Sequence, residues 1–140
     1  MVDLTAQGVV HYAIDSPFSQ TSLGTGGFTL ESTVAVSMLA PPGTAFKAIL
    51  SEINGARTYV AAMCNGMLQA AIDSTHAYGE TRQGFGKSLN QITRWQADFE
   101  AAKTALADAQ VTTDMAVDLI DKGMDAQLAA AQAKVAAVTT

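Results

Sequence analysis

The sequence has 140 residues, of which 49% are hydrophobic and 15% charged, so its length fits one ordinary domain and excludes a self-contained multidomain enzyme. Eight basic residues against thirteen acidic ones, a formal net charge of −5 and the lack of a basic run argue against a protein that binds nucleic acid or anionic membranes. Cys64, the single cysteine, excludes an internal disulfide and favours a reducing, cytoplasmic location, while apolar runs shorter than ~20 residues predict no membrane span.

Residues 1–42 form a first segment that is rich in Ser, Thr and Gly and contains no Lys or Arg. Within it, residues 28–30 and 33–36 are predicted as short strands, because alternating and β-branched side chains suit a half-buried pleat. The Pro-Pro-Gly sequence at 41–43 is a turn signal. We therefore expect a β and loop segment over 1–42, followed by a helical segment over 43–140.

The apolar side chains after this boundary recur every three or four residues, which is the spacing of one helical face. We expect a helix over about 44–78, which would be about 50 Å long at the standard rise. Its inward stripe would consist of Phe46, Leu50, Ile53, Val60, Cys64, Met67, Ala71 and Thr75. The helix should end within residues 78–87, where three glycines weaken helical continuation.

Ser88 and Gln91 have the spacing of a capping box, in which Ser88 accepts a hydrogen bond from the backbone of Gln91 and the Gln91 side chain reaches back. We expect a second helix over about 88–122, which Gly123 should end. A third helix should cover about 125–138. The inward stripe of the second helix would consist of Ile92, Trp95, Phe99, Ala102, Leu106, Ala109, Ala116 and Ile120.

The second helix is apolar on more than one side, because Val111, Met115 and Leu119 form a stripe beside the inward one. Contiguous apolar patches larger than about a few hundred Å² are rare on the surface of monomers. We therefore expect an oligomer or a missing partner. The predicted fold class is mainly α: an antiparallel bundle of long helices preceded by a short β-rich segment.

Other chemical patterns in the chain are incomplete. Residues 86–88 (Gly-Lys-Ser) match the end of a P-loop, but Thr81 stands where that pattern needs a glycine and a helix precedes it. His11 and His76 have no second histidine or cysteine at metal-ligand spacing, and Cys64 lies on the apolar helix face as a small hydrophobic residue. We therefore expect no metal site, nucleotide hydrolysis or cysteine nucleophile.

Residues 82–87 read Arg-Gln-Gly-Phe-Gly-Lys and precede a helix that contains Gln96. An arginine, two residues and then Phe-Gly-Lys, followed by spaced glutamines, resembles the C-terminal helical domain of the acyl-CoA dehydrogenases. Residues 37–42 resemble the end of the preceding β domain of that family, and 43–46 resemble the entry to the first helix. The resemblance covers about residues 28–138; its other matching segments are Ala56-Arg57, Val60-Ala61-Ala62, Gly66, Ala70-Ala71-Ile72-Asp73 and Tyr78.

This resemblance implies FAD as cofactor and an acyl-CoA thioester as substrate. By position, Arg82 would contact the FAD pyrophosphate of a neighbouring subunit, and Phe85 would pack near that same cofactor. Gln96 would lie near the same dinucleotide, while Arg57 would lie on the substrate side, near the acyl-CoA. A guanidinium can bind two phosphate oxygens at once, which gives the arginine match a physical basis. Without the family, Arg57 and Arg82 would be interpreted as surface ion-pair residues and Phe85 as a packing residue of the hairpin.

The chain also departs from the family pattern. Gly84 stands where the family often has Gln or Thr, and Thr93 replaces the first glutamine of the second helix, so the expected cofactor contacts are weaker. The family's reaction needs a carboxylate that removes the α-proton while the flavin accepts the β-hydride. In some members this glutamate precedes the helix arginine, where this chain has Ala56, and in most it lies in a later loop. We therefore expect no catalytic residue within these 140 residues.

We expect an acyl-CoA dehydrogenase-like flavoprotein segment that takes part in the α,β-dehydrogenation of acyl-CoA thioesters and is incomplete alone. It would form a homo-oligomer or combine with a complementary acyl-CoA dehydrogenase subunit. The alternative is a non-catalytic helical assembly module that keeps the family's oligomerisation surface. A third interpretation, a flavin monooxygenase of the same fold, is less favoured because the Phe-Gly-Lys turn fits the dehydrogenases better.

Overall fold

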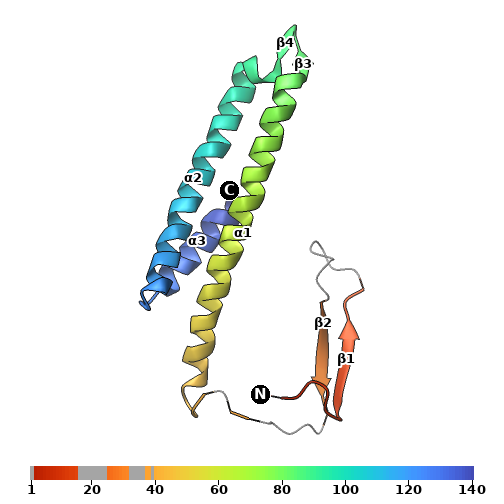
Figure 1. Ribbon diagram of the computed structural model, residues 1–140, viewed down its shortest axis with the longest axis vertical. Coiled ribbons are helices and arrows are strands. Elements are labelled where there is room, and N and C mark those ends of the chain that lie inside the picture. The colour runs from red at the N-terminus through yellow and green to blue at the C-terminus, as the bar shows by residue number, and fades with distance from the viewer. Residues whose placement is uncertain (1, 16–24, 32–36, 39) are drawn as a thin grey trace. The chain divides into compact units, whose positions relative to one another are not determined.

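The computed structural model divides the chain into two units, Met1–Phe46 and Lys47–Thr140. The structure describes four ranges of the chain: residues 2–15, 25–31, 37–38 and 40–140. The first unit contains a two-stranded sheet, and the second contains most of the helical residues (Figure 1). In the described part of the chain, no helix is long and apolar enough to cross a bilayer.

The first unit is built on one antiparallel pair of strands. β1 (Val9–Ala13) pairs with β2 (Gly26–Leu30) in a register that sets Val9 opposite Leu30 and Ala13 opposite Gly26. The predicted strand at 28–30 is part of β2, whereas the strand predicted at 33–36 lies outside the described residues. Our sequence analysis missed β1, although its Val-Val-His-Tyr sequence has the β-branched and aromatic side chains that favour strands.

The second unit consists of three helices and a small hairpin, and the predicted fold class is confirmed. α1 (Ala45–Thr81) and α2 (Thr93–Asp121) run side by side in opposite directions. The hairpin connects them, and the shorter α3 (Gln127–Thr139) packs beside the far end of α2 (Figure 1). The 37 residues of α1 make it about 55 Å long, so it is the longest helix of the second unit.

Small side chains form the junction of the three helices. The buried cluster contains Ala61 of α1, Ala116 of α2, and Ala130, Ala133 and Ala137 of α3. Among the described residues, no large side chain is fully buried. Alanine presents little bulk between helices, so their backbones can approach closely, but it buries little apolar area.

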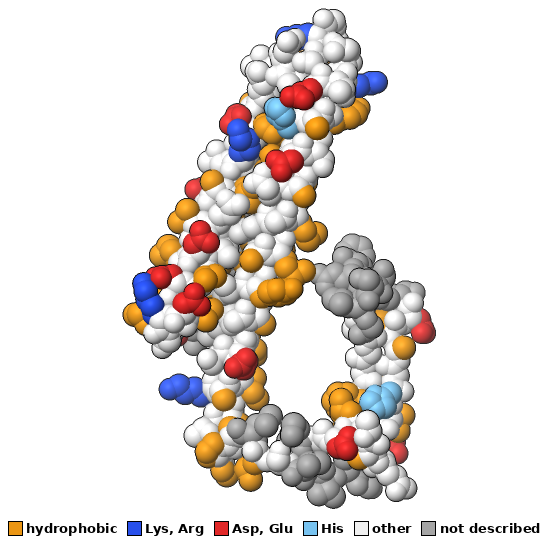
Figure 2. All heavy atoms as spheres, viewed as in Figure 1, with side chains coloured by type: hydrophobic (Ala, Val, Ile, Leu, Met, Phe, Trp, Pro, Cys, Tyr) orange, Lys and Arg blue, Asp and Glu red, His pale blue; other side chains and the backbone are white. Residues whose placement is uncertain are grey.

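The larger apolar side chains of the second unit lie mostly outside this junction. Figure 2 shows hydrophobic side chains along the visible face of the helices. The exposed large hydrophobic residues of the three helices are Phe46, Ile49, Ile53, Tyr59, Val60, Met67, Tyr78, Val111, Met115, Val117, Ile120, Leu128, Val135 and Val138. Two members of the predicted second stripe, Val111 and Met115, are therefore exposed as expected.

Most of the inward stripe that we predicted for α1 is wrong, although Leu50 and Cys64 are half-buried and Cys64 packs against the alanine cluster. Phe46 is 73% exposed and Met67 is 66% exposed, and Ile53, Val60, Ala71 and Thr75 are exposed as well. The buried residues of α1 are instead Thr58, Ala61, Asn65, Ile72 and Gly79. The two sets are offset by one residue over much of the helix, which turns the inward face by about 100°. The side chains that α1 buries are mostly small or polar, so apolar periodicity identified a face that remains uncovered.

The inward stripe predicted for α2 agrees better with the structure. Leu106, Ala109 and Ala116 are buried, whereas Ile120 is exposed and that part of the prediction is wrong. A buried hydrogen bond also joins the two long helices: the Asn65 amide donates to Oγ1 of Thr113 over 3.0 Å. This bond gives the buried Asn65 amide a partner, and the Thr113 hydroxyl in turn donates to the carbonyl of Ala109 over 2.8 Å.

The predicted capping box at Ser88 is also wrong. Ser88 lies in a short strand of the hairpin and makes no side-chain cap, and a single 3₁₀ turn, η1 (Leu89–Gln91), follows it. The backbone N–H of Leu89 donates to the carbonyl of Arg82 over 3.0 Å, so this stretch continues the hairpin. α2 therefore begins only at Thr93.

The predicted stop at Gly123 is confirmed. Gly123 has a φ of 65°, its N–H donates to the carbonyl of Ile120, and the N–H of Met124 donates to the carbonyl of Leu119, each over 2.9 Å. These two bonds form a Schellman motif, which needs a left-handed residue and so favours glycine. The motif turns the chain from α2 into α3.

α1 makes its closest approach to the connecting segment at Gly79. A Cβ atom added at Gly79 would overlap the Asn90 side chain and lie 2.8 Å from its Cγ and 3.1 Å from Nε1 of Trp95. By contrast, a Cβ added at Gly66 of the same helix would meet nothing within 4 Å. Only the first of the two glycines is therefore required by packing.

We predict opposite effects for Gly79→Ala and Gly66→Ala on the free energy of unfolding. Gly79→Ala should lower it by about 2 kcal/mol, because the new methyl group overpacks the contact with Asn90. Gly66→Ala, the matched control, should raise it by about 0.5–1 kcal/mol through the better helix propensity of alanine. Urea denaturation followed by circular dichroism measures both values. Equal effects of the two substitutions would contradict the close approach at Gly79.

Candidate functional site

The hairpin between α1 and α2 ends in a tight two-residue turn. β3 (Gln83–Gly84) pairs with β4 (Lys87–Ser88), with Gln83 opposite Ser88 and Gly84 opposite Lys87. The two residues between the strands both have positive φ, 54° at Phe85 and 77° at Gly86. Positive φ at both central positions is characteristic of a type I′ turn, which matches the twist of a two-stranded ribbon.

Phe85 is an unusual residue for this turn. A bulky side chain at positive φ costs about 1–2 kcal/mol, and type I′ turns favour Asn or Gly at this position. The Phe85 side chain is 98% exposed, so within this chain it gains nothing from burial to offset that cost. Backbone strain of this kind clusters at binding sites and clamps. The turn therefore presents an aromatic ring outward at the end of a rigid helix pair.

Arg82 is the first residue after α1, and its backbone makes one hydrogen bond to α1 and one to the residue that follows the hairpin. Its N–H donates to the carbonyl of Tyr78, and its own carbonyl accepts from Leu89, each over 3.0 Å. The exposed Arg82 side chain makes no ion pair with any residue that the structure describes, because the nearby Glu80 faces His76 at 3.7 Å. The guanidinium is thus left with its positive charge unneutralised.

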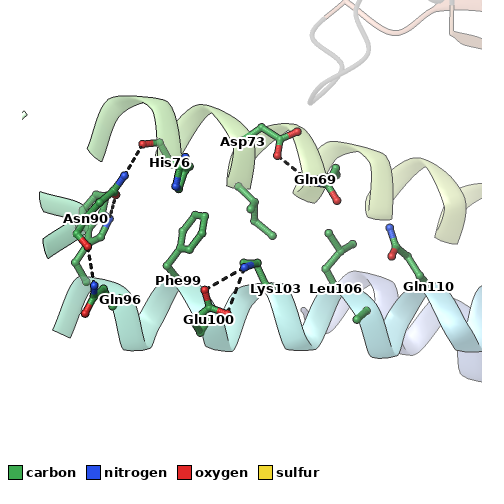
Figure 3. A pocket seen from close by; sticks show the side chains of 13 residues that line it. Gln69, Asp73, His76, Asn90, Gln96, Phe99, Glu100, Lys103, Leu106 and Gln110 are labelled. Carbon is green, nitrogen blue, oxygen red and sulfur yellow. Dashed lines mark hydrogen bonds and ion pairs between the residues drawn. The ribbon is translucent and has the colours of Figure 1, made fainter. Parts of the chain in front are cut away.

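Gln96 lies in the first turns of α2 and is oriented by Asn90. Its Nε2 donates to the backbone carbonyl of Asn90 over 2.8 Å. The Asn90 side chain in turn donates from Nδ2 to the carbonyl of His76 and accepts from Nε1 of Trp95, each over 3.0 Å. Figure 3 shows Asn90 between the end of α1 and the start of α2, with Gln96 beside it.

The structure brings Arg82, Phe85 and Gln96 to one end of the helix pair, but it leaves Arg57 far from them. Arg57 lies in the first half of α1, where it is half-buried and donates from Nη1 to Oδ1 of Asn54 over 3.3 Å. Twenty-five residues of helical rise separate Arg57 from Arg82, which is about 37 Å. The four sequence-predicted residues therefore form two separate groups.

A groove of about 640 Å³ lies between α1 and α2, next to Asn90 (Figure 3). His76 and Phe99 face each other across it with ring centroids 5.5 Å apart. Lys103 lies 5.6 Å from the centre of the Phe99 ring and pairs with Glu100 at 3.0 Å. The Lys103 ammonium is already paired with the Glu100 carboxylate and lies over the Phe99 ring. This lysine of the groove is therefore not free to bind an anion.

The described part of the chain contains no group of three or more His, Cys, Asp or Glu residues that could hold a metal ion. Cys64 is half-buried beside the alanine junction. Ala56, at the position where some family members have a glutamate, is exposed and carries no proton-accepting group. Ala56 therefore supplies no base that could remove a proton from carbon.

Our sequence analysis missed the contacts between Gly79, Asn90 and Trp95. Trp95 was placed on an inward stripe and Asn90 inside a capping box, so neither was expected to bond with the other. The available signal was the glycine at 79 on the face that α1 buries. The glycine alone did not predict these contacts, because the apolar spacing of α1 indicated a different buried face.

The chain is similar to known proteins of one family. A model of the family described as "Acyl-CoA dehydrogenase, C-terminal domain" matches residues 43–140. The chain is 33% identical over 101 residues to the mitochondrial short-chain specific acyl-CoA dehydrogenase of Bos taurus, and the aligned region covers 72% of this chain and 24% of that protein. It is 32% identical over 88 residues to the probable acyl-CoA dehydrogenase YngJ of Bacillus subtilis, which covers 63% of this chain and 21% of that protein. The chain thus spans less than a quarter of the length of these two relatives.

Solved structures show the same fold. Butyryl-CoA dehydrogenase from Megasphaera elsdenii superposes on 94% of this chain with a TM-score of 0.86 and 24% sequence identity, and the match covers 35% of that enzyme. An acyl-CoA dehydrogenase from Slackia heliotrinireducens superposes on 96% of the chain with a TM-score of 0.80 and 20% identity, covering 36% of that protein. The family match extends over most of the chain and includes the hairpin with Arg82 and Phe85. On this basis the chain belongs to the acyl-CoA dehydrogenase family, of which it contains the C-terminal helical domain region.

Proposed function

We propose that this chain is the FAD-contacting helical part of an enzyme that dehydrogenates acyl-CoA thioesters between the α and β carbons. The observation that carries this proposal is the hairpin at the end of α1. There the Arg-Gln-Gly-Phe-Gly-Lys segment forms a strained turn with its aromatic ring almost fully exposed. The family match supports the reaction class, and the names of the relatives support acyl-CoA as the substrate class.

The side chains at the hairpin fit the chemistry of a flavin dinucleotide. The Arg82 guanidinium has no carboxylate partner among the described residues and can donate two parallel hydrogen bonds to phosphate oxygens. The exposed Phe85 ring offers an apolar face to a flat ring system. Lys87, next to the turn, is exposed and adds a second positive charge. FAD, when bound, supplies the hydride acceptor, and these residues bind and orient it.

The separation of Arg57 from Arg82 supports an oligomer. We propose that Arg57 acts on the acyl-CoA side and that Arg82 acts on the cofactor side. Because a straight helix holds the two arginines about 37 Å apart, they would serve different sites, each completed by a second subunit. The exposed apolar residues of α1, such as Phe46 and Met67, support such an interface.

We further propose that the catalytic base comes from outside these 140 residues. Ala56 cannot act as a base, so a carboxylate from another part of the protein or from a complementary subunit would remove the α-proton. The helical segment over 43–140 would then be the functional unit, which the start of the family match at residue 43 supports. Cys64 is the only cysteine of the sequence, which supports a reducing location such as the cytoplasm.

One observation favours a second candidate function. The helices expose many large apolar side chains while the base is absent, as a non-catalytic assembly module would. Such a module would form a stable oligomer and bind no flavin. Light scattering, together with the visible spectrum of the purified chain, distinguishes the two: a yellow protein favours the dehydrogenase segment, and a colourless stable oligomer favours the module.

We predict that Arg82→Ala weakens FAD binding by roughly 1.5–3 kcal/mol, because it removes a charge-assisted contact to phosphate. Arg94→Ala is the matched control, since the Arg94 side chain is 91% exposed on α2 and its ion pair with Asp98 is long, at 3.9 Å. Its effect on FAD binding should be within twofold. Titration of the purified chain with FAD, followed by flavin fluorescence, measures both affinities. Equal affinities of wild type and Arg82→Ala for FAD would show that Arg82 has no part in FAD binding.

We predict that Phe85→Asn raises stability but weakens FAD binding. Asn tolerates positive φ and forms the preferred Asn-Gly type I′ turn, so the free energy of unfolding should rise by about 1 kcal/mol. The loss of the aromatic face should weaken FAD binding by about tenfold. Thermal denaturation and flavin titration measure the two effects. A variant that is more stable and binds FAD as tightly as wild type would show that the ring has no part in binding.

A further inference from the structure

Asn90 is the residue through which the hairpin, α1 and α2 are joined. Its side chain bridges the two helices, since Nδ2 donates to the carbonyl of His76 in α1 and Oδ1 accepts from Nε1 of Trp95 in α2. Its backbone carbonyl accepts from the Gln96 side chain. We propose that Asn90 is a positioning residue for the FAD contact at this hairpin, an assignment that rests on the proposed function.

Asn90 is linked to the base of the hairpin through its neighbour in the chain. The residue before Asn90, Leu89, donates its N–H to the carbonyl of Arg82 over 3.0 Å. Asn90 is anchored to α1 at His76, and no side chain at Gly79 pushes it away. Because Asn90 holds Leu89 in place, and Leu89 holds the backbone of Arg82, the direction in which the hairpin leaves α1 depends on Asn90.

Asn90 also sets the orientation of the Gln96 amide. A side-chain amide has one end that donates hydrogen bonds and one that accepts them. Since Nε2 of Gln96 is bound to the carbonyl of Asn90, Oε1 is the end left to accept a hydrogen bond from a ligand hydroxyl or amine. Arg82 then supplies donors to phosphate while Gln96 supplies an acceptor. Asn90 positions the first through Leu89 and the second through its own backbone carbonyl.

We assign no direct ligand to the Asn90 side chain, because its hydrogen bonds are made within the chain. Both ends of the amide are engaged, and the residue is half-buried between the helix ends. In this proposal Asn90 acts on the cofactor through Arg82 and Gln96. A positioning role predicts that its removal changes the geometry of those two residues without removing a direct contact.

The chain offers a matched control and a specific probe. Asn65 also bridges α1 and α2 with its amide, by donating to Thr113, but it lies at the middle of the helices, away from the hairpin. Trp95 is the only tryptophan of the sequence, so its single indole N–H resonance reports directly on the bond to Asn90. Comparing Asn90→Ala with Asn65→Ala separates positioning of the hairpin from a general loss of stability.

The experiment uses the 140-residue chain and three measurements on each variant. These are the position of the Trp95 indole resonance, the amide hydrogen exchange of residues 82–88, and the affinity for FAD. In Asn90→Ala we expect a shifted indole resonance, exchange at 82–88 at least about fivefold faster, and FAD binding weaker by about tenfold, the scale of one lost hydrogen bond. In Asn65→Ala we expect the indole resonance and the exchange at 82–88 unchanged, and FAD affinity within twofold.

Unchanged exchange at 82–88 in Asn90→Ala, or an equal loss of FAD affinity in both variants, overturns the proposal. Trp95→Phe removes the indole donor and keeps a smaller aromatic ring, so it decides the question if Asn90→Ala does not fold: it should also speed exchange at 82–88. If the wild-type chain binds no FAD, the proposed function fails for this chain. The positioning claim is then decided by exchange alone, where faster exchange confined to the Asn90 and Trp95 variants supports it.

Discussion

The side chain of Asn90 occupies the space that a Cβ atom on residue 79 would need. This close approach fixes where the connecting segment meets α1, because Asn90 reaches the backbone of His76 only if residue 79 carries no side chain. From there the hydrogen bond between Leu89 and Arg82 sets the start of the hairpin, and the hairpin carries Phe85 outward. The exposed Phe85 ring and the Arg82 guanidinium, which has no ion-pair partner in the described part of the chain, thus depend on a contact made inside the helix pair.

The same helices are joined by small residues elsewhere, and this has a different consequence. Alanine at the three-helix junction allows close packing but buries little apolar area, so the larger hydrophobic side chains remain outside. These exposed side chains are apolar area that burial against a further surface would stabilise. The proposed oligomer, the proposed second subunit at each site and the proposed external base all agree with this incompleteness.

The sequence predicted the fold class, the end of α2 at Gly123 and the alanine and leucine face of α2, because each depends on local pattern. The buried face of α1 could not be predicted in the same way, since apolar spacing there marks residues such as Met67 that this chain leaves exposed. The capping box at Ser88 failed because backbone bonds to Arg82 compete with helix initiation. The contacts of Asn90 join residues up to fourteen positions apart, which no local pattern specifies.

The central claim is that the Phe85 turn is where this chain meets the flavin dinucleotide. Nuclear Overhauser contacts between FAD and the ring protons of labelled phenylalanine test it most directly, because Phe85 lies at the turn while Phe99 lines the groove between α1 and α2. We expect contacts from FAD to the Phe85 ring and none to Phe99. Contacts to Phe99 without any to Phe85 would place the ligand in the groove and contradict it.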